Sequence, residues 1–143
     1  MGVSISAIIA FGFDLGNEAD LPNALLQAGA TTGGFDFSAV VARHLGLSQP
    51  NHANHSPAWT AYWTSVDDGV KAFPVTLIKH CTAHEPMYFL AVQGTQTRAR
   101  LGEVEAVTLG AVSTQQVEAF RAFCDRYGVA WAEPSWQFFS YWN

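Results

Sequence analysis

The last eight residues hold five aromatic side chains, and this ending limits what the chain can fold into. Chain ends usually fray, and large apolar side chains left in water promote aggregation. If the tail is a strand, alternate side chains point to opposite sides, so both of its faces need cover. We therefore predict a terminal strand that is mostly part of the core. The five residues are Trp136, Phe138, Phe139, Tyr141 and Trp142.

Two further stretches are apolar on both sides, which is typical of central strands. One is residues 3–13, where Ile8 and Ala10 make the second side apolar. The other is residues 86–92 in EPMYFLAVQ. A preceding run, PVTLIKHCT, is joined to it by only AHEP, so the two predict an antiparallel hairpin.

Capping and stop signals predict four helices in the rest of the chain. Ser113 and Gln116 form a capping box before the clearest of them, which Gly128 ends. Asp20 and Asp36 are predicted N-caps of two shorter helices. Ser56 and the proline after it favour a helix over 57–73, although alternating aromatics leave a strand over 57–66 open.

The element order is strand, helices, hairpin, helix, strand. It predicts an α+β fold with a ferredoxin-like β-α-β-β-α-β antiparallel sheet and a long helical insertion before the second strand. The chain of 143 residues has the size of one domain, 1–143. Since such a sheet has helices on one face only, the insertion or a second copy of the chain has to cover the other.

The charge pattern narrows the choice of partners. Charged residues make up only 13% of the chain, so its surface has few charges that oppose self-association, and we expect a homodimer. The net charge of −5 and seven scattered cations argue against nucleic acid. No signal-peptide pattern and no apolar run of about 18 residues is present, so we expect a cytoplasmic protein without a membrane partner.

No motif indicates catalysis, a metal or another cofactor. His52, His55, His80 and His84 invite a zinc hypothesis, but strand positions four apart lie about 13 Å from each other. Solvated loop histidines explain the same residues. Both cysteines, at 81 and 124, lie in apolar surroundings and are predicted to be inert core residues.

Polar side chains follow the second two-sided strand in GTQTRARLGE. Hydroxyls and guanidinium groups can bind a carboxylate or phosphate, so these residues are candidate ligands for an anion. The alternative is a strand end in solvent, with Arg100 paired to an acidic residue at 103 or 105. The candidates are Thr95, Thr97, Arg98 and Arg100.

Aromatic residues at helical spacing form a second candidate set. Trp59, Tyr62 and Trp63, with Trp142 of the tail, could stack on a flat ligand or anchor a protein interface. Packing in the core explains them equally well.

The stretches HCTAHEPMYFLAVQGTQTRARLGE and EPSWQFFSYWN resemble small uncharacterised proteins encoded by tailed phages and prophages. The resemblance covers the second half of the chain. It implies expression in a bacterial cytoplasm and an accessory role, often the binding of a host factor. It transfers no catalytic residue, and LGEVE stands where such proteins tend to have a Gly-Pro-like turn.

These observations favour a non-enzymatic accessory protein that binds a bacterial host protein through an aromatic surface of low charge. The alternative is a small-molecule binding protein, for an anion or a nucleotide, or a small enzyme that uses the Thr/Arg strand end.

Overall fold

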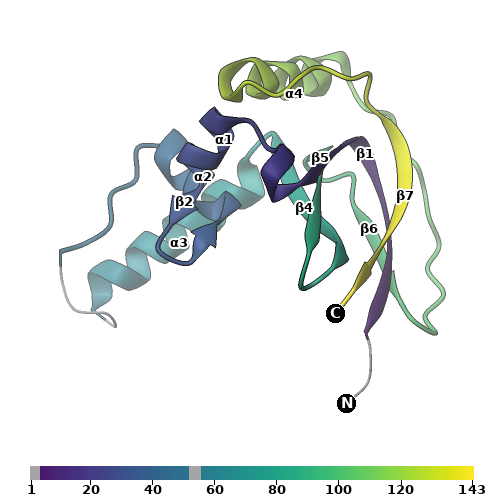
Figure 1. The fold of residues 1–143 in the computed structure, drawn as a ribbon, viewed down its shortest axis with the longest axis horizontal. Coiled ribbons are helices and arrows are strands. Elements are labelled where there is room, and N and C mark those ends of the chain that lie inside the picture. Colours follow the sequence, from purple (N-terminus) through teal and green to yellow (C-terminus); the bar gives the residue numbers. More distant parts are fainter. Residues whose placement is uncertain (1–3, 52–55) are drawn as a thin grey trace. The chain divides into compact units, whose positions relative to one another are not determined.

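The computed structural model describes residues 4–51 and 56–143, which form an α+β fold with a five-strand mixed sheet and four α-helices (Figure 1). The chain divides into two compact units. A sheet unit comprises residues up to Pro22 and from Pro74 onward, and a helical unit comprises Asn23–Phe73. The prediction of one domain over 1–143 is not tested by this division.

The sheet unit contains five strands, a short 3-10 helix and one α-helix in its described residues. They are β1 (Ile5–Asn17), η1 (Glu18–Asp20), β4 (Val75–Thr82), β5 (Pro86–Val92), β6 (Thr97–Arg100), α4 (Thr114–Tyr127) and β7 (Ser135–Trp142).

Strand β1 pairs with three other strands and organises the sheet. One of its edges pairs antiparallel with β7 over residues 5–12. Its other edge pairs antiparallel with β6 over residues 6–9 and with β5 over residues 12–17. β4 pairs antiparallel with β5, and its end at residues 81–82 pairs parallel with residues 141–142 of β7. The pairings β1–β5–β4–β7–β1 therefore close into a ring.

This ring requires a bent strand. It contains three antiparallel steps and one parallel step. Each antiparallel step reverses the strand direction. Because the ring contains an odd number of reversals, the direction does not match when the ring returns to β1, so one strand has to turn within it. β1 arches strongly in Figure 1 and shifts register between Asp14 and Gly16. Gly12 stands where the β7 and β5 pairings meet, and a Cβ there would overlap the carbonyl oxygen of Leu90.

The interior of the ring is apolar. Two half-buried side chains of β7, those of Phe139 and Tyr141, pack against its buried core cluster. The rings of Phe89 and Phe139 are stacked with their centroids 4.5 Å apart. The buried cluster comprises Ile8, Ala10, Ile78, Phe89 and Ala91.

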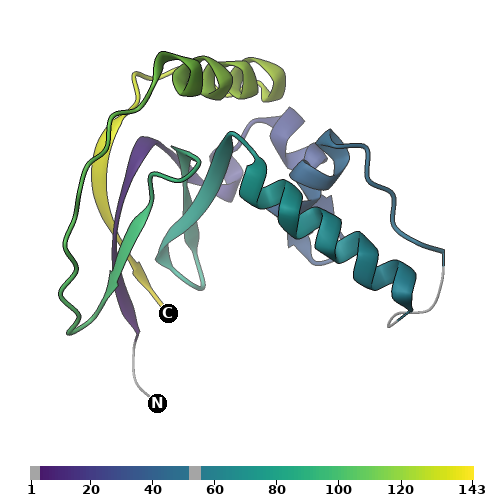
Figure 2. The same ribbon diagram turned by 180° about the vertical axis from the view of Figure 1, so that it is seen from behind.

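Helix α4 lies over one end of the sheet unit (Figures 1 and 2). The predicted capping box is confirmed, because Ser113 and Gln116 each bond the other's backbone N–H. Gly128 ends the helix in the left-handed conformation, at φ 73°. Phe120 is buried and packs edge-on against Phe13 of β1, with ring centroids 5.3 Å apart.

The helical unit contains α1 (Asn23–Ala28), α2 (Phe37–His44), α3 (Pro57–Ala72) and a two-stranded hairpin of β2 (Ala30–Thr31) and β3 (Gly34–Phe35). Ser56 caps α3, which confirms the helix favoured over 57–66. Gly69 lets α2 and α3 pack closely, since a Cβ there would lie 2.5 Å from Leu45 Cδ1. No helix in the described residues is long and apolar enough to cross a bilayer.

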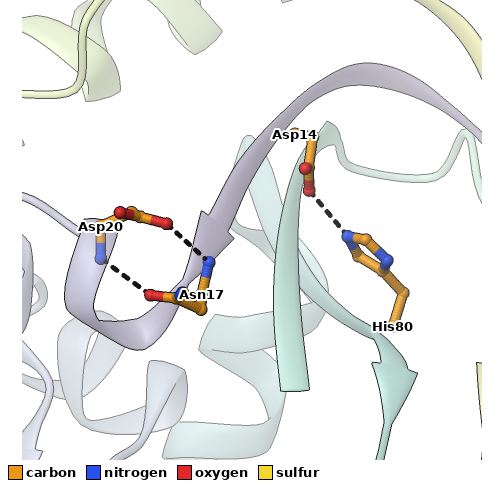
Figure 3. Close-up of polar contacts among 4 residues, drawn as sticks. All are labelled: Asp14, Asn17, Asp20 and His80. Carbon is orange, nitrogen blue, oxygen red and sulfur yellow. Dashed lines mark hydrogen bonds and ion pairs between the residues drawn. The ribbon is translucent and has the colours of Figure 1, made fainter. Parts of the chain in front are cut away.

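Asp20 does not cap α1, so that prediction is wrong. Its carboxylate accepts from the backbone N–H of Asn17 at 3.2 Å, and Asn17 Oδ1 accepts from the N–H of Asp20 at 3.2 Å (Figure 3). Asp20 is therefore the third residue of η1, and α1 begins at Asn23, after Pro22. The cap of α2 by Asp36 is confirmed.

The α+β class is confirmed, whereas the ferredoxin-like topology is not shown. The sheet is mixed rather than antiparallel, has a fifth strand and closes on itself. The prediction that the tail is mostly core is correct for one side of β7 only. Phe138 is 71% exposed and Trp142 is 51% exposed, although Trp136 on the same side of β7 is half-buried.

Because β1 and β5 approach closely at the bend, a single methyl group added at Gly12 should strongly lower the stability of the fold. Gly12→Ala should lower the free energy of unfolding by about 2–4 kcal/mol, because backbone atoms of β5 leave no room for a Cβ. Gly110→Ala is the control, since nothing lies within 4 Å of a Cβ there. Urea unfolding of both variants measures the difference. Equal stability of the two variants would show that β1 and β5 do not approach as described.

Candidate functional site

One side of β6, β1 and β7 forms an apolar surface that can be traced by register. Cross-strand partners share a face, and alternate residues of a strand point the same way. Thr97 and Phe138 lie opposite Ile9, and Trp142 lies opposite Ile5. The outer sheet face defined in this way comprises Ile5, Ala7, Ile9, Phe11, Thr97, Ala99, Trp136, Phe138, Ser140 and Trp142.

The outer sheet face contains no ionisable side chain, on a chain with 19 charged residues. Small residues form its middle row, Ser140 opposite Ala7 opposite Ala99. Larger side chains, those of Phe138 and Trp142 among them, form the rows on either side. The face therefore offers protruding aromatic rings on both sides of a flat strip.

Helix α4 explains why one end of this face is covered and the other is open. Phe13 continues the same side of β1 and is buried against Phe120 of α4. Phe11 is half-buried and packs edge-on against Trp136 with ring centroids 5.5 Å apart. Further from α4, Phe138 and Trp142 are exposed. The cover thus ends near Phe11.

An exposed segment follows β6 and continues the apolar surface. The backbone N–H of Leu101 donates to Ile5 O at 2.9 Å, which places Leu101 beside Ile5, and its side chain is 73% exposed. Every residue from 101 to 111 is exposed and none is in a strand or helix (Figure 2). Val104 is 98% exposed, and Val107 and Leu109 are also exposed. Sequence reasoning missed this exposed apolar segment.

The predicted anion ligands do not converge. Thr95 Oγ1 accepts from Phe11 N at 3.1 Å and donates to Val92 O at 2.7 Å, so its hydroxyl holds the edge of β1. Thr97 points to the outer sheet face. The two arginines at 98 and 100 lie opposite Ile8 and Ser6, so they point to the other face. The carboxylate of Glu103 accepts from the backbone N–H of Arg100 at 3.0 Å.

The predicted aromatic set of α3 does gather within the helical unit. The rings of Trp59 and Trp63 are stacked at 6.2 Å, and Tyr62 meets Trp63 edge-on at 5.1 Å. Trp63 is 48% exposed, and the other two are half-buried. The three rings thus pack against one another while part of their surface stays exposed to water.

Cys81 lies in a cavity of about 540 Å³ at the β4–β5 turn, which His84 and Glu85 also line. It is exposed and adopts a left-handed backbone conformation, with φ 69°, so the prediction of a core cysteine is wrong. Residues in regular strands seldom have this conformation. The exposure of Cys81 therefore reflects the nearby turn rather than the apolar run that precedes it. Cys124 is buried, as predicted.

The described residues contain no group of three or more metal-ligating side chains. His80 Nε2 lies 2.7 Å from Asp14 Oδ1, which joins β4 to β1, as Figure 3 shows. His84 belongs to the cavity at Cys81. His52 and His55 lie outside the described residues.

The two thiols should differ sharply in reactivity. Burial, with a smaller contribution from Asp125, raises the pKa of Cys124 to about 11, which keeps this thiol protonated. We expect one rapid equivalent of Ellman's reagent per folded chain, from exposed Cys81, and a second only after unfolding. Cys81→Ser should abolish the rapid phase. Two rapid equivalents would contradict the burial of Cys124.

Thr95 should act in stability rather than in anion binding. Thr95→Val leaves the N–H of Phe11 without its acceptor, so the free energy of unfolding should fall by about 1–3 kcal/mol. In Thr97→Val the loss should stay within about 0.5 kcal/mol, because the Thr97 hydroxyl has no hydrogen bond within the described residues. Thermal or urea unfolding measures both. Equal losses would remove the assigned role of Thr95.

Comparison with family models, with curated proteins and with solved structures found no match to this chain. Its function therefore has to be inferred from its own geometry. The outer sheet face is an apolar surface without an ionisable side chain, and the exposed segment after it carries Glu103 and Glu105 among its apolar residues.

Proposed function

We propose that this chain is a non-enzymatic binding protein that docks a partner protein on the outer sheet face. One observation carries the proposal: the face has no ionisable side chain, yet Phe138 is 71% and Trp142 is 51% exposed. Aromatic side chains provide much of the binding energy in protein interfaces. The partner that fits the resemblance to phage proteins is a bacterial host protein, met in the bacterial cytoplasm.

The absence of charge on the face favours a protein surface over a polar ligand or nucleic acid. Burial of a charge without a partner is costly, and this face has none to bury. Nucleic acid is bound chiefly through Lys and Arg, whereas this chain has only seven such residues and a net charge of −5. An apolar patch on another protein would lose water from both surfaces at no electrostatic cost.

The size of the face indicates that the partner reaches beyond it. With a strand spacing of about 4.8 Å and a rise of about 3.3 Å per residue, the eight paired residues of β1 and β7 give a face of about 10 by 26 Å, and the four residues of β6 raise the area to roughly 320 Å². A stable protein interface buries about 800 Å² on each partner. The exposed segment 101–111 begins beside Ile5 and adds Leu101 and Val104 to the available surface. The proposed contact therefore includes the apolar side chains of this segment, with Glu103 and Glu105 at its rim in water.

A homodimer is the second part of the proposal. With charged residues at only 13%, little repulsion opposes the approach of two copies. Two copies would bury the same outer sheet face, so the homodimer competes with the host complex. The concentration of the chain then determines which of the two forms.

For the fold, we propose a closed variant of the ferredoxin-like arrangement. Neighbouring strands in the order β7-β1-β5-β4 are all antiparallel, which is the order that the sequence pattern predicts. β6 and the parallel contact between β4 and β7 are then additions. The alternative function, anion binding at the Thr/Arg strand end, has less support because those side chains point to opposite faces.

A charge placed on the outer sheet face tests the proposal. In a pull-down from bacterial lysate, Phe138→Lys should reduce recovery of the partner captured by the wild type by about 30-fold, the effect of losing an interface anchor. Gln137→Lys is the matched control, because Gln137 is exposed and points to the opposite side of β7. Light scattering over a range of concentrations should show a dimer that Phe138→Lys dissociates.

Two outcomes would contradict the proposal. One is a wild-type chain that stays monomeric at every concentration and captures no protein. The other is an equal loss of capture in Gln137→Lys and Phe138→Lys, which would show that the outer sheet face is not the contact.

A further inference from the structure

A cavity of about 660 Å³ lies within the helical unit, and neither the outer sheet face nor the proposed partner explains it. Its volume falls within the range of about 300–1,000 Å³ that is typical of small-molecule sites. Polar side chains from the β2–β3 hairpin, α2, the loop after α2 and α3 line it, with alanines and a leucine between them. The polar residues are Thr31, Thr32, Arg43, Gln49 and Tyr62.

Arg43 is held in the wall of this cavity by backbone carbonyl groups. Its Nη1 donates to Gln27 O at 3.0 Å and to Ala28 O at 2.6 Å. Its Nη2 donates to Ala30 O at 2.6 Å. These acceptors belong to the end of α1 and the start of β2, so the guanidinium group is fixed before any ligand arrives. Such preorganisation lowers the entropy cost of binding.

The charge of Arg43 is not neutralised by a carboxylate in the described part of the chain. The ion pair found among residues 4–51 and 56–143 joins His80 to Asp14. Asp36, at the start of α2, accepts instead from the backbone N–H of Ser38 at 2.9 Å. The carbonyl groups accept three hydrogen bonds from Nη1 and Nη2 of Arg43, so two of its five N–H groups, one of them on Nε, are left for a ligand. A guanidinium N–H that carries positive charge is a strong hydrogen-bond donor to a carboxylate oxygen.

Tyr62 gives the cavity an aromatic wall. Its ring lies edge-on to Trp59 at 5.8 Å and to Trp63 at 5.1 Å, so its orientation is constrained by two neighbours. Tyr62 is half-buried, and Ala39 and Leu47 line the same cavity. A flat ring can pack against such a wall.

We propose that this cavity binds a small aromatic carboxylate, with the carboxylate on Arg43 and the ring against Tyr62. The site is independent of the outer sheet face, so either proposal can fail without the other. The sequence did not single out Arg43, because the carbonyl groups that fix it come from residues 13 to 16 positions earlier.

Benzoate and its neutral analogue benzamide provide a matched pair of probes for the full-length chain. Titration followed by NMR should show saturable shifts with benzoate at about millimolar concentration, the range expected for so small a ligand. The shifts should centre on the Arg43 Nε–H and the backbone amides of Thr31, Thr32 and Gln49. Benzamide should leave these signals unchanged at the same concentrations.

Tyr62→Ala keeps the Arg43 clamp and should weaken benzoate binding about tenfold, the effect expected of a lost stacking contact. Arg43→Lys keeps the charge without the planar fork and should also weaken it, provided that the amide spectrum shows a folded chain. Arg98→Lys in the sheet unit should change nothing. The proposal is overturned if benzamide shifts the same signals equally, if benzoate shifts do not saturate, or if Tyr62→Ala binds benzoate as the wild type does.

Discussion

The sheet unit depends on one strand that pairs along both edges and turns while it does so. β1 contributes its first half to β7 and β6 and its second half to β5. Because β4 then meets β7, every described strand of the sheet unit except β6 belongs to a closed ring. Gly12 makes the turn possible, since β5 backbone atoms fill the space of its absent side chain. Closure also leaves few exposed edges, which reduces edge-to-edge aggregation.

The same closure divides the aromatic side chains of the tail into an inner and an outer set. Phe139 and Tyr141 pack onto the core inside the ring, whereas Phe138 and Trp142 face outward. α4 covers the outer side only near Phe13. The apolar surface that remains is thus a consequence of ring size and helix position. One half of the tail therefore contributes to the core, and the other half is the exposed surface on which the proposed docking depends.

Elements governed by local signals were predictable from the sequence. The capping box at Ser113 and Gln116 and the stop at Gly128 depend on neighbouring residues, and both are confirmed. The two-sided apolar runs correctly indicated that β1 and β5 are interior strands. The Asp20 cap failed because Asn17 offered a competing partner three residues away.

Features that depend on distant contacts could not be predicted in the same way. Alternation told which tail residues share a face, but only the ring shows which face is covered. The Thr95 hydroxyl accepts a hydrogen bond from the backbone N–H of Phe11, 84 residues away in the sequence. The alternation of side chains along β6 places Thr97 and Arg98 on opposite faces. The left-handed conformation of Cys81 arises where β4 enters its turn. Which side chains are buried, and which lie together in one site, depends on the whole fold.

The most direct measurement is NMR of the aromatic side chains in the presence of a soluble paramagnetic probe. We expect the ring signals of Phe138 to be strongly broadened, while those of Phe139 keep their intensity and show nuclear Overhauser contacts to Phe89. Dilute samples keep the chain apart from a second copy. Equal protection of both rings, or broadening of Phe139 instead, would contradict the division of the tail into an inner and an outer face.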